Sequence, residues 1–234
     1  IADQIGHLTY FDWTAALAIS DPDRFTSITG ELMSTMSPDA ADDAMDLATL
    51  GDYRAMSPED LLHAWRTNRG VLSEASASLG EQDRVIWYGP SMGSKSFLTA
   101  RLMEAWAHGQ DIVDTLQQND VNAPERPHTD RIRHIAQLGF ITHKWSYINR
   151  QLEVPSAPVH VSLTSPSGAT WDFGPDDAAD TITGAAVDFC LVATQRRHVD
   201  DTGLTVIGDV ATAWMNIAQA FAGGATDGPA AGTF

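Results

Sequence analysis

Two histidines and one glutamate have the residue types and spacing of a metal site. Glu104 and His108 are four residues apart in segment 101–111, which we predict to be helical. At about 3.6 residues per turn, their side chains project from the same helical face, one turn apart. A carboxylate and an imidazole in this arrangement can reach one divalent ion. A third ligand from another helix would complete a site with an open coordination position.

The same spacing is also typical of a solvated helical face. Arg101, Glu104, His108 and Asp111 form one polar stripe on the helical wheel. Most such stripes simply face water, and a Glu/His pair is a weak motif by itself. The spacing alone therefore leaves both interpretations open.

The composition argues against a nucleic-acid partner. The formal net charge is −17, from 31 acidic and 14 basic residues, and this field repels phosphate backbones. The basic residues Arg131, Arg133 and Lys144 are scattered rather than gathered in a patch. We expect small-molecule partners instead.

Cysteine usage and hydropathy favour a cytoplasmic protein without a membrane partner. Cys190 is the only cysteine, which excludes an internal disulfide and fits a reducing compartment. It lies in the apolar run 187–193, which predicts a buried structural thiol. No apolar stretch approaches the length of about 20 residues that a membrane span needs, and no signal-peptide pattern opens the sequence.

Periodicity and turn residues divide the chain into a helical part and a mixed part. Ser57 as N-cap and Pro58 at the first helical position mark one clear helix start. The expected helices of the first part are 1–20, 57–79 and about 94–117, with short helical stretches in 23–55 and a linker at 118–128. In the second part we expect a helix at 129–142, a hairpin from 158–164 and 168–174, and helices at 185–195 and 209–221.

These elements predict an α+β protein with two domains. We place a metal-binding helical bundle at 1–128 and an α+β domain at 129–225. The Gly/Pro/Ala-rich tail, 226–234, is expected to be flexible.

Two helical segments resemble a known family. Residues 101–111 resemble the last bundle helix, and residues 5–12 an earlier ligand helix, of the mycothiol-dependent maleylpyruvate isomerase family in the DinB-like superfamily. The resemblance implies a DinB-like bundle in which His7 joins Glu104 and His108 as metal ligands. Relatives carry another helix before the one with His7, so we expect a native helix to precede Ile1.

The second domain shares this resemblance. Segments 183–190, 195–198 and 217–223 are similar to the second domain of an actinobacterial metal-binding subgroup, which looks sterol-carrier-like. The ligand set favours Zn²⁺, with Fe²⁺ and Ni²⁺ as alternatives. The resemblance implies mycothiol as the thiol cofactor.

Asp12 and Asp111 are candidates for orienting a ligand histidine through a hydrogen bond, without contacting the metal themselves. Asp12 falls within an apolar helical arc, where a buried carboxylate needs a partner. Asp111 follows His108 by about one turn. The alternatives are a partly exposed groove edge for Asp12 and solvated surface for Asp111.

Arg196 and Arg197 follow an apolar helix and are the candidate catalytic residues. A guanidinium binds a carboxylate through two hydrogen bonds, but a cation there could equally interact with the helix dipole. The resemblance places an arginine near the active site in this region, without deciding between the two.

The interpretation favoured by these observations is a metal-dependent enzyme that activates a small thiol for isomerisation or for transfer to an electrophilic substrate. The alternatives are a hydrolase that uses metal-bound water and a non-catalytic module that binds a small molecule or lipid.

We predict that the protein does not bind tRNA at physiological salt, because counterion release needs clustered Lys and Arg. Fluorescence anisotropy with labelled tRNA tests this. Micromolar binding that weakens as salt rises would contradict the prediction.

Overall fold

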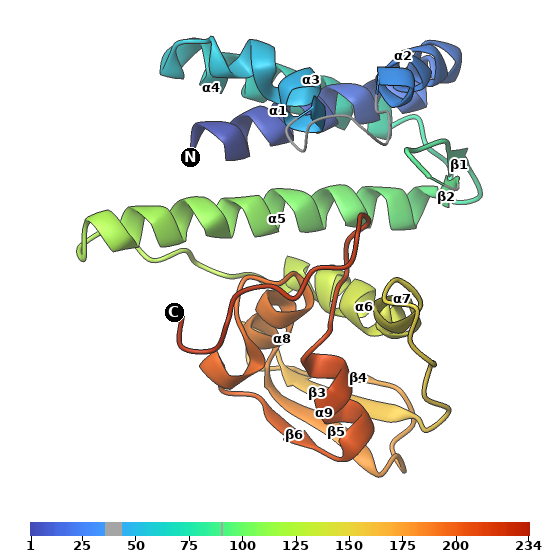
Figure 1. Cartoon of the computed structure of the whole chain (residues 1–234), viewed down its shortest axis with the longest axis vertical. Helices are drawn as coiled ribbons and strands as arrows, with labels where there is room; N and C mark the ends of the chain where they lie inside the picture. Colours follow the sequence, from blue (N-terminus) through green and yellow to red (C-terminus); the bar gives the residue numbers. More distant parts are fainter. Residues whose placement is uncertain (36–43, 90) are drawn as a thin grey trace. The chain divides into compact units, whose positions relative to one another are not determined.

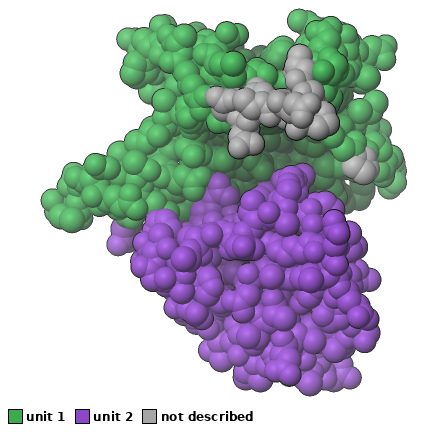
Figure 2. Space-filling model, viewed as in Figure 1, with its two compact units in different colours: residues 1–122 green, residues 123–234 purple. Residues whose placement is uncertain are grey.

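The structure is a computed structural model that describes residues 1–35, 44–89 and 91–234. Residues 36–43, which belong to the segment expected to contain short helical stretches, lie outside the described residues, as does Pro90. The chain divides into two compact units, 1–122 and 123–234 (Figure 2). The first unit is helical and the second contains a sheet, so the predicted α+β class is confirmed.

A central helix organises the first unit (Figure 1). Its helices are α1 (Ala2–Ser20), α2 (Pro22–Thr35), α3 (Ala44–Arg54), α4 (Pro58–Ser76) and α5 (Ser94–Asn119). Helix α1 packs against the other four, most extensively against α4. Leu8 and Ala15 of α1 are almost completely buried, as expected for a helix that is covered on several sides. This central position holds His7 within the unit.

The ends of the long helices follow from local chemistry. Ser57 caps α4 as predicted, because its hydroxyl accepts a hydrogen bond from the Asp60 amide at 3.2 Å. Helix α5 has Gly93 as its N-cap, without a side-chain hydrogen bond to cap it. The hydroxyl of Ser94 instead donates to the Gly80 carbonyl at 2.8 Å, which ties the start of α5 to the turn after α4.

An aromatic cluster anchors the start of α5. The ring of Trp87 stacks on Phe25 of α2 at 5.6 Å and meets Phe97 of α5 edge-on at 5.1 Å. Phe25 and Phe97 are both 1% exposed, so their burial supplies much of the local packing energy. The cluster lies beside a short antiparallel ladder of β1 (Arg84–Val85) and β2 (Met92–Gly93).

The second unit combines a four-stranded sheet with short helices. Its elements are η1 (Asp130–Ile132), α6 (Arg133–Ile141), α7 (His143–Ile148), β3 (Val159–Thr164), β4 (Thr170–Phe173), β5 (Asp180–Ala185), α8 (Ala186–Ala193), η2 (Val199–Asp201), β6 (Thr205–Ile207) and α9 (Asp209–Met215). The strand order is β4-β3-β5-β6. The predicted hairpin is confirmed as the antiparallel pair β3–β4, whereas β5 pairs with β3 in parallel.

The core of the second unit lies between the sheet and its helices. Val161, Leu163 and Ile182 are 0% exposed and alternate with less buried neighbours along their strands. Phe189 and Cys190 of α8 are also 0% exposed. Burial raises the pKa of the Cys190 thiol, which suits the expected structural role.

None of the described helices is long and apolar enough to cross a membrane.

Candidate metal centre

The three predicted metal ligands lie together in the first unit. His7 is on α1, and Glu104 and His108 are on α5. One ligand atom from each side chain lies within 4.8 Å of the other two. Glu104 Oε2 is 3.2 Å from His7 Nε2 and 3.1 Å from His108 Nε2.

These separations match those of neighbouring donors around a small divalent ion. Zinc bonds to nitrogen and oxygen of about 2.0–2.2 Å place adjacent tetrahedral ligands about 3.4 Å apart. Two imidazoles and one carboxylate are also a donor set that Zn²⁺, Fe²⁺ and Ni²⁺ accept. The residues therefore fit an ion with an open coordination position, while metal binding itself stays a prediction.

The surroundings of His108 create a demand for a cation. Its Nδ1 lies 3.3 Å from Asp111 Oδ2 and is also hydrogen-bonded to Gln4 Oε1, while its Nε2 faces Glu104. A neutral imidazole has only one N–H, so it cannot donate from both nitrogens. In the tautomer whose Nδ1–H donates to Asp111, a metal ion or a second proton between Nε2 and the carboxylate would satisfy both groups. With a metal ion there, Asp111 and Gln4 would orient the ring through Nδ1–H.

The protonation states also suit a metal. Burial tends to raise the pKa of Glu104, but hydrogen bonds from His108 and His7 outweigh it and hold this pKa well below its usual range. Burial lowers the pKa of His7, against the opposing hydrogen bond to Glu104. An ionised glutamate and a neutral histidine are the forms that bind metal, so folding prepares both ligands at neutral pH.

The sequence suggested that Asp12 would orient a ligand histidine, but its partner in the structure is Arg101. Its carboxylate accepts a hydrogen bond from the Arg101 guanidinium at 3.0 Å, and the two residues are 5% and 7% exposed. Arg101 lies on α5 about one turn before Glu104, and its charge helps to lower the pKa of both Glu104 and His7. Asp12 thus balances a buried cation beside the candidate centre.

Asp111 and Gln4 both contact His108, although only Asp111 was expected from the sequence. Gln4 precedes His7 by three residues on α1, so the two side chains share a helical face. This spacing was a signal that the sequence contained, but a lone glutamine has no ligand character and did not stand out.

Arg196 and Arg197 belong to the second unit, and their catalytic role stays a prediction. They follow α8 directly, and the guanidinium of Arg197 lies 3.9 Å from the centre of the Phe234 ring. Both backbone amides hydrogen-bond to the Leu191 carbonyl, so the backbone of this pair is held against the last turn of α8.

Comparison with known proteins gives a family and two relatives. The sequence profile described as the mycothiol maleylpyruvate isomerase N-terminal domain matches residues 1–113. Two uncharacterized proteins from Mycobacterium tuberculosis, of strains CDC 1551 and H37Rv, are each 42% identical over 223 residues. The match covers 95% of this chain and 82% of each relative. No solved structure matches significantly.

We predict about one divalent ion per chain, lost in the variants His7→Ala and His108→Ala. Removing either imidazole leaves two donors from the chain, which is too few to retain zinc tightly. Metal content after dialysis, measured by mass spectrometry, checks this. The variant His63→Ala is the control, because His63 is an exposed histidine of the same unit and should leave the content unchanged. Full occupancy in both ligand variants would rule out the site.

We predict that Asp12→Ala destabilises the protein by about 3–5 kcal/mol, because it leaves the Arg101 charge buried without its partner. The double variant Asp12→Leu/Arg101→Met removes both charges and should recover much of this loss. Urea unfolding followed by circular dichroism measures both. If the free energy of unfolding of Asp12→Ala lies within about 0.5 kcal/mol of the parent value, the usual range for surface substitutions, the pair is not effectively buried.

Proposed function

Because the chain belongs to the mycothiol maleylpyruvate isomerase N-terminal domain family, we propose that it is a metal-dependent enzyme that acts through a small thiol such as mycothiol. His7, Glu104 and His108 hold the ion, with Zn²⁺ as first choice. The helical unit is a DinB-like bundle and the second unit a sterol-carrier-like domain. A bound divalent ion would deprotonate a coordinated thiol and so provide a nucleophile at neutral pH.

The donor set is the observation that carries this proposal. Two neutral imidazoles and one carboxylate leave a divalent ion with a net charge of about +1 and an open position. The nearby Asp12–Arg101 pair is neutral as a whole and does not change this balance. An anionic fourth ligand such as a thiolate is therefore favoured. A reducing cytoplasm, which fits the single unpaired Cys190, is where such a thiol would be available.

Arg196 or Arg197 binds a carboxylate of the substrate or of the thiol cofactor in this proposal. The chain carries a net charge of −17, so an anionic ligand needs a local cation to offset the general repulsion. A guanidinium meets this need with two parallel hydrogen bonds to one carboxylate. The reaction class is isomerisation or transfer of the thiol to an electrophile.

The open coordination position also supports a second candidate. The same ligand set can hold a water molecule, and the protein would then be a metal-dependent hydrolase. Whether a thiol enters the metal's coordination shell separates the two candidates.

We predict that the Co²⁺-substituted protein gains an intense sulfur-to-metal charge-transfer band when mycothiol is added. The reason is that an open position next to a net positive ion favours a thiolate ligand. Titration followed by absorption spectroscopy tests this, and the metal-depleted His108→Ala variant should show no band. If no small thiol changes the spectrum, the thiolate mechanism fails and the hydrolase becomes the better candidate.

We predict that Arg196→Met or Arg197→Met lowers turnover about a hundredfold without changing the metal content. Loss of a bidentate, charge-assisted contact should cost about 2–4 kcal/mol in transition-state binding. Arg131→Met, a substitution of an exposed arginine elsewhere in the second unit, is the matched control. Normal turnover in both test variants would remove the arginines from the mechanism.

A further inference from the structure

The turn that carries the two arginines contains an unusual backbone conformation. Helix α8 ends in a left-handed residue, Gln195, with a φ of 58°. The amide of Gln195 donates to Val192 at 2.9 Å, and that of Arg196 donates to Leu191 at 2.7 Å. This pair of hydrogen bonds is the Schellman pattern, in which glycine is usual at the left-handed position. A glutamine at this position costs more conformational energy than a glycine would.

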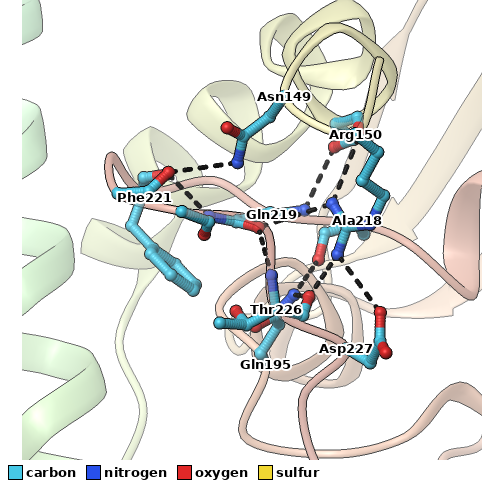
Figure 3. A network of polar contacts seen from close by, with 11 residues as sticks. Asn149, Arg150, Gln195, Ala218, Gln219, Phe221, Thr226 and Asp227 are labelled. Carbon is cyan, nitrogen blue, oxygen red and sulfur yellow. Dashed lines mark hydrogen bonds and ion pairs between the residues drawn. The ribbon is translucent and has the colours of Figure 1, made fainter. Parts of the chain in front are cut away.

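The side chain of Gln195 is held by a segment more than twenty residues further along the chain (Figure 3). Its Nε2 donates to the carbonyls of Ala218 at 3.1 Å and Thr226 at 2.6 Å. Its Oε1 accepts a hydrogen bond from the Thr226 hydroxyl at 2.6 Å. Both ends of the amide are therefore bound by segment 218–226.

Segment 218–226 is itself anchored through Gln219, which is only 1% exposed. The backbone amide of Gln219 donates a hydrogen bond to the Ser146 hydroxyl of α7 at 3.1 Å. The side-chain oxygen of Gln219 accepts from the Thr226 amide at 3.3 Å and from Arg150 at 3.4 Å. The support for Gln195 is thus a hydrogen-bonded network rather than a single loop contact.

A second glutamine shows that the turn itself does not require such support. Gln151, after α7, has a φ of 56°. Its amide donates to Ile148 at 3.0 Å, and the next amide, that of Leu152, donates to Tyr147 at 3.0 Å. The side chain of Gln151 is exposed, and within the described part of the chain it makes no hydrogen bond. The two turns share residue type and backbone geometry and differ in the clamp on the side chain.

We infer that Gln195 is a positioning residue, whose side chain locks the turn against segment 218–226 and so fixes the direction of Arg196 and Arg197. The role in anion binding rests on the function proposed above for these arginines. The clamp lies immediately before them, and their amides are bonded to the same carbonyl of α8, that of Leu191. A held backbone reduces the conformational freedom that the guanidinium groups lose when they bind a carboxylate.

The decisive comparison is between Gln195→Gly and Gln151→Gly in the full chain. Glycine accepts a positive φ without strain, so neither variant should unfold the protein. Each variant adds the same backbone freedom, but only Gln195→Gly removes the clamp. We expect amide hydrogen exchange at Arg196 and Arg197 to accelerate about tenfold or more in Gln195→Gly, and amide exchange at Leu152 to change by less than about threefold in Gln151→Gly.

A third variant separates the clamp from the glycine. Thr226→Val removes the hydroxyl that donates to Gln195 Oε1 and leaves the backbone at residue 195 unchanged. It should accelerate exchange at Arg196 and Arg197 in the same direction. Equal amide exchange at Arg196 and Arg197 in the parent protein, Gln195→Gly and Thr226→Val would overturn the clamp. This outcome does not depend on whether the arginines bind an anion.

The functional part has its own measurement. Maleate serves as a dicarboxylate probe, and the Arg196 and Arg197 side-chain resonances report its binding by NMR titration. We expect affinity to fall about tenfold in Gln195→Gly and to be unchanged in Gln151→Gly. If amide exchange at Arg196 and Arg197 accelerates in Gln195→Gly but the affinity for maleate stays the same, the positioning role is overturned. If Arg196→Met and Arg197→Met also bind maleate normally, it is the proposed function of the arginines that fails, independently of the exchange result.

Discussion

The first unit depends on the balance of buried charge between α1 and α5. Two polar contacts join these helices: the ion pair of Asp12 with Arg101, and the hydrogen bond between His7 and Glu104. The residue nearer the start of α1 meets the residue further along α5, so the pairs fix an antiparallel register. A slip of one residue would separate both pairs, and it would leave the charges of Asp12 and Arg101 unpaired in a buried interface, which costs several kcal/mol. The candidate centre is therefore held by the same contacts that align its helices.

The packing of the other helices makes this register possible. Gly6 precedes His7, and a Cβ at Gly6 would lie 3.2 Å from the Tyr53 Cβ. The glycine thus lets α3 approach α1 closely beside the first ligand. On the other helix, Ser94 and the aromatic cluster around Trp87 fix where α5 begins. The position of Glu104 and His108 along α5 then follows from a rise of about 1.5 Å per residue.

Local features of this protein were visible in the sequence, whereas long-range partners were not. The Glu104/His108 pair and the Ser57 cap depend on residues within one turn, and both geometries were predicted. His7 is 97 residues from Glu104, and only the family resemblance suggested that they meet. The partner of Asp12 was missed although Arg101 had been noted, because nothing in a helical pattern specifies which distant helix packs against it.

In the second unit, too, the sequence did not predict some of the backbone structure. Strands β5 and β6 were not predicted, since β5 contains Gly184 and β6 is only three residues long. Helix α9 ends at Met215, short of the predicted 221. Residues beyond it carry an apolar pattern that suits a helix, but Ala220 donates its amide to the Ala193 carbonyl at 2.8 Å, which is a contact with α8. Hydrogen bonds from side-chain amides to distant backbone leave no periodic signal.

The two units stabilise their functional side chains by different chemistry, and the difference follows from charge. In the first unit ionised groups face one another, as in the buried pair of Asp12 and Arg101. In the second unit the clamp consists of neutral amides, Gln195 and Gln219. A glutamate at 195 would direct a carboxylate at the carbonyls of Ala218 and Thr226, losing both donated hydrogen bonds. It would also place a negative charge next to Arg196 and Arg197 and compete with any anion they bind. Neutral amides hold the turn without adding a negative charge beside the two guanidinium groups.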